Sequence, residues 1–132
     1  RPQARQQLES ILHPLVRQHR DAFLEKHRAV AAPAVVLDVP LLFETGGDAV
    51  CDYIIVVHAS AATTAKRALA RAGMTPAKLA AILALQMPVD VKKKWADLCL
   101  DSDLQPNVTR QDLIEWLAAI HVPMKDSDQA QF

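Results

Sequence analysis

Three polar residues stand in or just after apolar runs, at positions where α/β proteins place their ligand sites. Asp38 lies inside one run, Glu44 follows that run after a short turn, and His58 closes a second run. Open parallel sheets bind ligands beyond the carboxyl ends of their strands, so each residue is a candidate for binding or catalysis. Structural alternatives stay open: Asp38 can bond a neighbouring loop, Glu44 can be solvated, and His58 can simply end a strand.

Two arginines form a second candidate site. Arg67 and Arg71 are four residues apart, which places both on one face of a predicted helix that also carries Lys66. A pair of guanidinium groups can chelate phosphate oxygens through charge-assisted, planar hydrogen bonds. The alternative is a solvated basic face, and the same alternative applies to the lysine run at residues 92–94.

The glycine and cysteine patterns exclude several kinds of site. Gly46, Gly47 and Gly73 are the only glycines, and their spacing fits neither G-x-x-x-x-G-K-[ST] nor G-x-G-x-x-G. Both motifs need glycine where the backbone approaches a phosphate closely. Cys51 and Cys99 form no C-x-x-C and no His/Cys cluster at zinc spacing, so the sequence predicts two reduced thiols and no metal site.

Composition limits the partners of the protein. The chain has 132 residues, of which 51% are hydrophobic, enough for one domain with a core. Lys+Arg and Asp+Glu number 15 each, and this net charge of zero predicts neither a nucleic-acid nor a membrane partner. No apolar run reaches the roughly 18 residues of a membrane helix, and we expect a cytoplasmic protein. The oligomeric state is left open.

Apolar runs rich in β-branched residues predict the strands. Residues 34–40 and 53–58 read as strands buried on both faces, as in a parallel sheet, and residues 98–100 as a short third strand. Helical segments between them supply the crossovers that parallel strands need, which indicates a layered α/β fold. Because the helix ahead of residue 34 has no strand before it, we expect part of the sheet to lie upstream of Arg1, in a longer protein.

Helical periodicity and capping residues predict the remaining elements. Apolar residues recur at helical spacing over residues 6–30, but Pro14 predicts one helix ending near Leu12 and a second beginning at the proline. Gly73 ends a later helix, and Thr75 caps the next one. Helices are expected over residues 61–72, 76–87, 90–96 and 110–120, and the tail from residue 123 is expected to fray.

Several sequence runs, taken in order, resemble bacterial dephospho-coenzyme A kinases. A His-Pro element, a Pro-Leu-Leu-Phe-Glu turn and an Ile-Leu-Ala-x-Gln-Met-Pro helix in series are hard to obtain from generic α/β patterning. The resemblance extends over roughly residues 1–120. The matching runs are LHPLV at 12–16, DVPLLFETG at 38–46, CDYIIVV at 51–57, RALAR at 67–71, GMT at 73–75 and AILALQMP at 81–88.

The resemblance implies an incomplete three-layer parallel sheet of the P-loop kinase type with a helical lid. Residues 1–132 would form the carboxyl-terminal portion of a single kinase domain, with the lid at residues 61–96. The family's phosphate-loop strand would separate the strands at 34–40 and 53–58, so these two are not expected to pair. The phosphate loop and the aspartate general base would both precede the matched runs.

The resemblance also implies a reaction. Members of this family transfer the γ-phosphoryl group of ATP, with Mg²⁺, to the ribose 3′-hydroxyl of dephospho-coenzyme A, the last step of coenzyme A synthesis. Arg67 matches a catalytic lid arginine that contacts the ATP phosphates, Arg71 a second ATP-binding arginine, and Ser102 a position beside the adenine. The positions matched to acceptor binding are His13, Pro40, Leu41, Leu42 and Glu44.

Three positions depart from the family pattern and bear on the nucleotide base. Thr64 stands where glutamine is usual, Val91 replaces a frequent glutamate, and Ser102 replaces the asparagine of an Asp-Asn pair. A serine hydroxyl can still hydrogen-bond an adenine edge. Without a phosphate loop, the chain alone is expected to be inactive. The alternatives are a non-catalytic coenzyme A-binding or protein-interaction module and another nucleotide kinase of the same fold.

Overall fold

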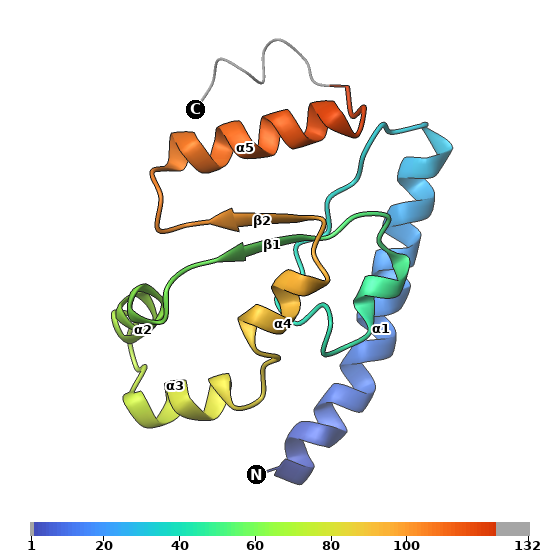
Figure 1. Ribbon diagram of the computed structural model, residues 1–132. Helices are drawn as coiled ribbons and strands as arrows, with labels where there is room; N and C mark the ends of the chain where they lie inside the picture. The colour runs from blue at the N-terminus through green and yellow to red at the C-terminus, as the bar shows by residue number, and fades with distance from the viewer. Residues whose placement is uncertain (1, 124–132) are drawn as a thin grey trace. The chain divides into compact units, whose positions relative to one another are not determined.

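The computed structural model describes residues 2–123, with the side chains of residues 2 and 4–6 left out (Figure 1). The predicted fraying of the tail concerns residues outside this range, apart from Pro123. Contacts divide the chain into two compact units, Arg1–Leu37 and Asp38–Phe132. The two candidate sites involving Glu44 and Arg67 both belong to the second unit.

The first unit contains one long helix, α1 (Pro2–Ala29), which runs without interruption through Pro14. The predicted break at Pro14 is therefore wrong. A proline in a helix interior removes one hydrogen bond and costs about 3 kcal/mol, but strong helix formers on both sides of it offset this cost. The helix ends where Ala31 adopts a left-handed conformation (φ 50°) and its amide donates to the Arg28 carbonyl at 3.0 Å.

The predicted strand at residues 34–40 does not form among the described residues. The segment is extended without regular secondary structure, and Val36 is 86% exposed. A strand is stabilised by hydrogen bonds to a partner strand, so β-branched composition alone does not produce one. Because residues 34–40 form no strand, the expected lack of pairing with residues 53–58 stays a prediction.

A tight turn follows at residues 40–46 and leads into a short 3-10 helix, η1 (Gly47–Val50). The Gly47 amide donates to the Leu42 carbonyl at 2.8 Å, and the Thr45 amide to the Leu41 carbonyl at 3.1 Å. Gly46 has a φ of 66°, which favours glycine. A Cβ at Gly47 would lie 3.0 Å from Leu42 Cδ1, so a larger residue there would require the Leu42 side chain to shift.

Two parallel strands form the sheet of the second unit: β1 (Ile55–His58) and β2 (Leu98–Asp101). Ile55 pairs with Leu98 and His58 with Asp101, so the carboxyl ends of the two strands are level. The prediction of parallel strands near 53–58 and 98–100 is confirmed with small changes of boundary. The prediction that residues 53–58 are buried on both faces is wrong, because Val57 is 65% exposed. The strand predicted at residues 34–40 is absent, so the sheet within residues 2–123 has two strands and not the three expected.

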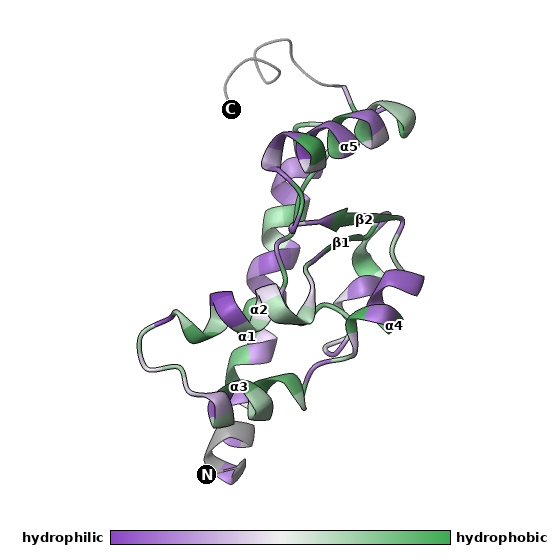
Figure 2. Ribbon diagram, turned by 60° about the vertical axis from the view of Figure 1, so that its left-hand side comes forward, coloured by the Kyte–Doolittle hydropathy of each residue, from purple (hydrophilic) through white to green (hydrophobic). Residues whose placement is uncertain are grey.

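The helices of the second unit pack on this pair of strands and on each other. The helices are α2 (Ala61–Leu69), α3 (Pro76–Leu83), α4 (Val89–Lys94) and α5 (Pro106–Ala119). α4 contacts β1, α5 contacts β2, and α2 contacts α3 (Figure 1). In Figure 2 the lysines make the end of α4 hydrophilic, whereas α3 is mostly hydrophobic.

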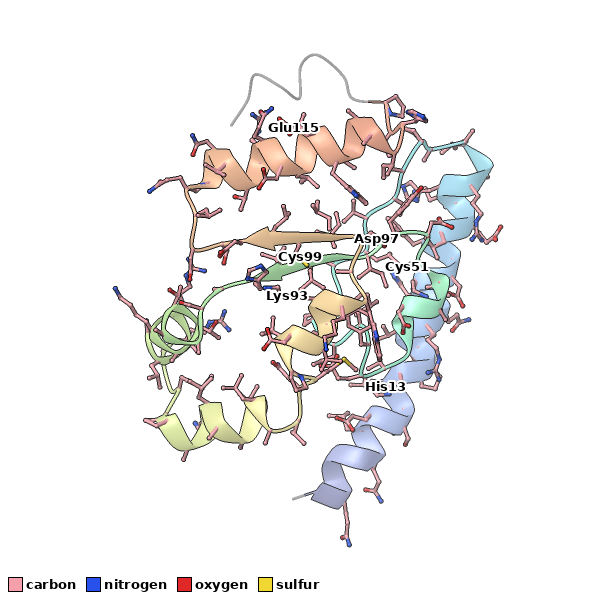
Figure 3. The ribbon with its side chains drawn as sticks, viewed as in Figure 1. His13, Cys51, Lys93, Asp97, Cys99 and Glu115 are labelled. Carbon is pink, nitrogen blue, oxygen red and sulfur yellow. The ribbon has the colours of Figure 1, made fainter. Side chains whose placement is uncertain are left out.

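Helix boundaries follow the capping residues. The Thr75 side chain accepts the Lys78 amide at 3.2 Å, with Pro76 as the first residue of α3, as predicted. α2 ends at Leu69, earlier than predicted, ahead of Gly73 with its φ of 74°. Just before β2, Asp97 Oδ2 accepts a hydrogen bond from the Ile54 amide at 2.7 Å. Figure 3 labels Asp97 where the chain enters the strand.

The core of the second unit is small. Val56 on β1 and Leu100 on β2 are buried, with 8% and 7% exposure. Tyr53 and Trp116 pack edge to face with ring centroids 5.4 Å apart, which joins the chain before β1 to α5. Among residues 2–123, no helix is both long and apolar enough to cross a bilayer.

The two faces of β1 allow a matched test of this core. Val56→Ala should lower the free energy of unfolding by about 2 kcal/mol, because it removes buried methyl groups and leaves a cavity. Val57→Ala, at the next position on the opposite face, where Val57 is 65% exposed, should cost less than about 1 kcal/mol. Urea denaturation of both variants measures the difference, and equal losses would contradict this assignment of the core.

Candidate functional site

Arg67 and Ser102, two residues predicted to bind ATP, are in direct contact in the structure. The guanidinium of Arg67 donates from Nη1 to Ser102 Oγ at 2.9 Å and from Nη2 to the Ser102 carbonyl at 2.8 Å. The two residues are 35 positions apart in the sequence. The contact joins α2, which follows β1, to the loop that follows β2, at the carboxyl ends of the two parallel strands.

The loop that receives Arg67 is itself held by hydrogen bonds. The Ser102 amide donates to the His58 carbonyl at 2.8 Å, which continues the strand ladder by one residue. Asp103 Oδ2 accepts the Ser60 amide at 2.9 Å, and the Asp103 amide donates to Asp101 Oδ1 at 2.9 Å. Arg67 therefore binds to a fixed position of the backbone.

Asp103 anchors the start of α2. Hydrogen bonds from Ser60, with a smaller contribution from Thr63 and from the charge of Arg67, hold the pKa of the Asp103 carboxyl below its usual 3.8. Ser60 is also the N-cap of α2, since its Oγ accepts the Thr63 amide at 3.2 Å. The carboxylate, the cap and the first turn of the helix thus form one connected cluster, which we call the strand-end cluster (Ser60, Arg67, Ser102 and Asp103).

The sequence analysis did not identify Asp103, although it lies only two residues beyond the end of β2. Nearness to the carboxyl end of a strand could have marked Asp103 as a candidate. The strand was expected to end at residue 100, whereas β2 ends at Asp101. Arg71 does not join the cluster through the expected helix face. α2 ends at Leu69, and the Arg71 amide donates to the Ala68 carbonyl at 3.1 Å in the turn beyond it. The prediction that Arg67 and Arg71 share a helix face is wrong.

Glu44 lies in a second cluster, at the turn of residues 40–46. Its Oε1 is 2.7 Å from Lys92 Nζ and accepts the Met87 amide at 2.8 Å. Both side chains of the ion pair are only 16% exposed. Phe43 and Trp95 pack edge to face beside it, with ring centroids 5.4 Å apart. The alternative of a solvated side chain therefore does not hold for Glu44 or for Lys92.

The electrostatics of Glu44 favour its ionised form. Burial raises the pKa of this carboxyl, but hydrogen bonds from Lys92 and Met87, together with the charge of Lys92, outweigh that effect and hold the pKa below its usual 4.5. Glu44 Oε2 is buried and has no hydrogen-bond partner among residues 2–123. One carboxylate oxygen therefore fastens the turn to α4, and the second contacts no donor in the described part of the chain.

The residues predicted to bind the acceptor fall in both units. His13 is exposed on α1 in the first unit and is labelled in Figure 3. Pro40 is exposed, and Leu41 and Leu42 are half-buried, in the turn that Glu44 fixes. The structure thus brings the turn residues together in one segment, while His13 is positioned separately by α1.

Two other candidates from the sequence have different surroundings from those expected. Asp38 is exposed on the extended segment, so the expectation of a carboxylate buried inside a strand is wrong. His58 is half-buried at the end of β1, as predicted, and pairs in register with Asp101. No group of three or more His, Cys, Asp or Glu side chains that could hold a metal ion occurs within residues 2–123.

The lowered pKa of Glu44 predicts a loss of stability in acid. A carboxyl whose pKa is lower in the folded than in the unfolded chain stabilises the fold above the unfolded pKa, and this stabilisation is lost as pH falls through the folded pKa. Glu44→Gln should lower the free energy of unfolding by about 1–2 kcal/mol near pH 7 and by much less near pH 3.

The measurement is urea denaturation of the protein and its variants across this pH range. Glu25→Gln is the matched control, because Glu25 pairs with Arg28 at the surface and its side chain is 73% exposed. It should change the free energy of unfolding by less than about 0.5 kcal/mol at either pH. A pH dependence for Glu44→Gln equal to that of the unsubstituted protein would refute the assigned ion pair.

Comparison with known proteins gives one consistent answer. The family model for dephospho-CoA kinase matches residues 1–107. A dephospho-CoA kinase of Mesorhizobium japonicum is 52% identical over 99 residues, covering 75% of this chain and 50% of the relative. One from Rhodopseudomonas palustris (strain CGA009) is 45% identical over 118 residues, covering 89% of this chain and 59% of the relative.

A further relative extends the comparison to another genus. A dephospho-CoA kinase of Brucella melitensis is 40% identical over 119 residues, covering 90% of this chain and 60% of the relative. No solved structure matches the chain at the same stringency. The chain spans about half to three fifths of the length of these curated relatives. Since the family model covers most of the 132 residues, the chain belongs to the dephospho-CoA kinase family.

Proposed function

We propose that this chain contributes the lid and part of the acceptor-binding surface of a dephospho-CoA kinase. The reaction would transfer the γ-phosphoryl group of ATP to the ribose 3′-hydroxyl of dephospho-coenzyme A. The whole protein would have the three-layer parallel sheet of P-loop kinases, of which β1 and β2 form part. Membership of the family supports the reaction, and the strand-end cluster supports the assignment of roles within this chain.

The position of Arg67 is the observation that carries the proposal. Its guanidinium lies where the carboxyl ends of β1 and β2 meet, which is the edge at which parallel sheets bind ligands. Phosphoryl transfer is promoted mainly by positive charge placed around the transferred group. Arg67 would supply such a charge to the ATP phosphates, and Arg71, in the exposed turn after α2, would supply a second one when the lid closes.

The lid proposed at residues 61–96 divides into two parts with different restraints. α2 packs on α3, and these two helices form the part that would move. α4 packs on β1 and is fastened to the turn by the Lys92–Glu44 ion pair at 2.7 Å, so it would remain fixed as the base of the lid. The turn would then present Pro40, Leu41 and Leu42 to the acceptor, with Glu44 holding its shape.

Other parts of the active site would come from outside these residues. The 132-residue sequence contains no G-x-x-x-x-G-K-[ST] motif, so the chain by itself should not turn over ATP. Residues 2–123 contain no group of three or more His, Cys, Asp or Glu side chains that could hold Mg²⁺. A cytoplasmic location and His13 as an acceptor contact both stay predictions.

A chimaera tests the proposed reaction. This chain would replace the matching part of the Mesorhizobium japonicum relative, and release of ADP would be followed in a coupled assay. We expect turnover that requires dephospho-coenzyme A and is not supported by nucleoside monophosphates. A folded chimaera that binds coenzyme A without turnover would favour a non-catalytic module, and phosphorylation of nucleoside monophosphates would favour another nucleotide kinase.

Substitution of Arg67 tests its role in the same chimaera. Arg67→Met should lower kcat by about 10³-fold, which is the scale on which an arginine at the transferred phosphoryl group acts. Lys66→Met is the matched control, because Lys66 precedes Arg67 on α2 and is also exposed. The control should change kcat by less than about threefold, because an exposed charge that does not contact the phosphates is screened by solvent. Equal losses in the two variants would rule out a specific role for Arg67.

A further inference from the structure

The family resemblance implies that Ser102 lies beside the adenine, but in the structure Ser102 is hydrogen-bonded to Arg67. Both polar atoms that Ser102 offers as acceptors, Oγ and the carbonyl oxygen, receive hydrogen bonds from the guanidinium of Arg67. The distances of 2.9 and 2.8 Å are those of well-formed hydrogen bonds. A hydroxyl engaged in this way is turned toward α2.

We infer that Ser102 is a positioning residue for Arg67, which sets the direction of its guanidinium at the carboxyl edge of the sheet. This inference rests on the proposed function. An exposed arginine side chain has many rotamers, and fixing one of them in advance reduces the entropy lost when a phosphate binds. Ser102 can do this because its own amide is bonded to the His58 carbonyl at 2.8 Å, so its position is set by the strands.

The contact leaves Arg67 able to bind an anion. A guanidinium has five N–H donors in one plane, and Ser102 takes one from each terminal nitrogen. The side formed by Nε and Nη2 keeps two donors that can bind phosphate oxygens as a fork. Ser102 and a phosphate can therefore be bound by Arg67 at the same time, so the contact orients the arginine without competing for it.

The neighbouring contacts make the orientation specific to this loop. Asp103 holds the first residue before α2 through the Ser60 amide at 2.9 Å, about two helical turns before Arg67. The helix is thus attached to the loop at two points along its length. Rotation of α2 about one attachment is opposed by the other, so Arg67 keeps its direction relative to β2 for as long as both attachments are made.

The first experiment measures the contact in the 132-residue chain and is independent of kinase activity. NMR spectroscopy of nitrogen-labelled arginine side chains reports rotation of the Arg67 guanidinium and exchange of its protons. Ser102→Ala should speed both by about five- to tenfold, because one charge-assisted hydrogen bond is lost, and Ser102→Thr should preserve them. Ser10→Ala, which removes a hydroxyl bonded within α1, is the control. Unchanged Arg67 signals in Ser102→Ala would overturn the inference.

The second experiment uses the active chimaera to separate positioning from base recognition. For positioning, Ser102→Ala should lower kcat about tenfold, leave the preference for ATP over GTP unchanged, and cause no further loss when combined with Arg67→Met. Ser102→Thr should restore kcat to within about threefold. A changed ATP-to-GTP preference, or losses that multiply in the double variant, would instead assign Ser102 to the base and refute the inference. If the chimaera shows no kinase activity, the proposed function fails, and the NMR result still decides the contact.

Discussion

Parallel pairing of β1 with β2 is the constraint on which the candidate sites depend. Parallel strands cannot be joined by a tight turn, so the chain from His58 must cross back to the start of β2. This crossover carries α2, α3 and α4, and it returns the loop after β2 to the level at which α2 begins. Arg67 and Ser102 meet for this reason, although they are 35 residues apart in the sequence.

The two clusters differ in how strongly they hold their elements. Glu44 and Lys92 are largely removed from water, so breaking their pair would leave a poorly solvated charge. Arg67 and Ser102 lie nearer the solvent, where a hydrogen bond is easily exchanged for bonds to water. The crossover therefore has one firmly attached end, at α4, and one readily released end, at α2.

Local signals predicted much of the fold. The Thr75 cap, the glycine after α2 and the two parallel strands depend on neighbouring residues or on composition, and each could be read along the chain. The failures depend on context. Pro14 continues a helix because its neighbours outweigh its cost, and residues 34–40 form no strand because strands require a partner. The Lys92–Glu44 and Arg67–Ser102 contacts join distant segments, and no periodicity along the sequence specifies such pairs.

A weak contact is sufficient for the role assigned to Ser102. An exposed hydrogen bond to a charged group contributes about 1 kcal/mol, which is too little to matter for the stability of a domain. The same energy shifts the population of a side-chain rotamer by roughly fivefold, because about 1.4 kcal/mol corresponds to a factor of ten. Orientation of a group before it meets its ligand needs only such a shift. The exposure of the Arg67–Ser102 contact is therefore consistent with positioning, whereas a purely structural link would gain from burial.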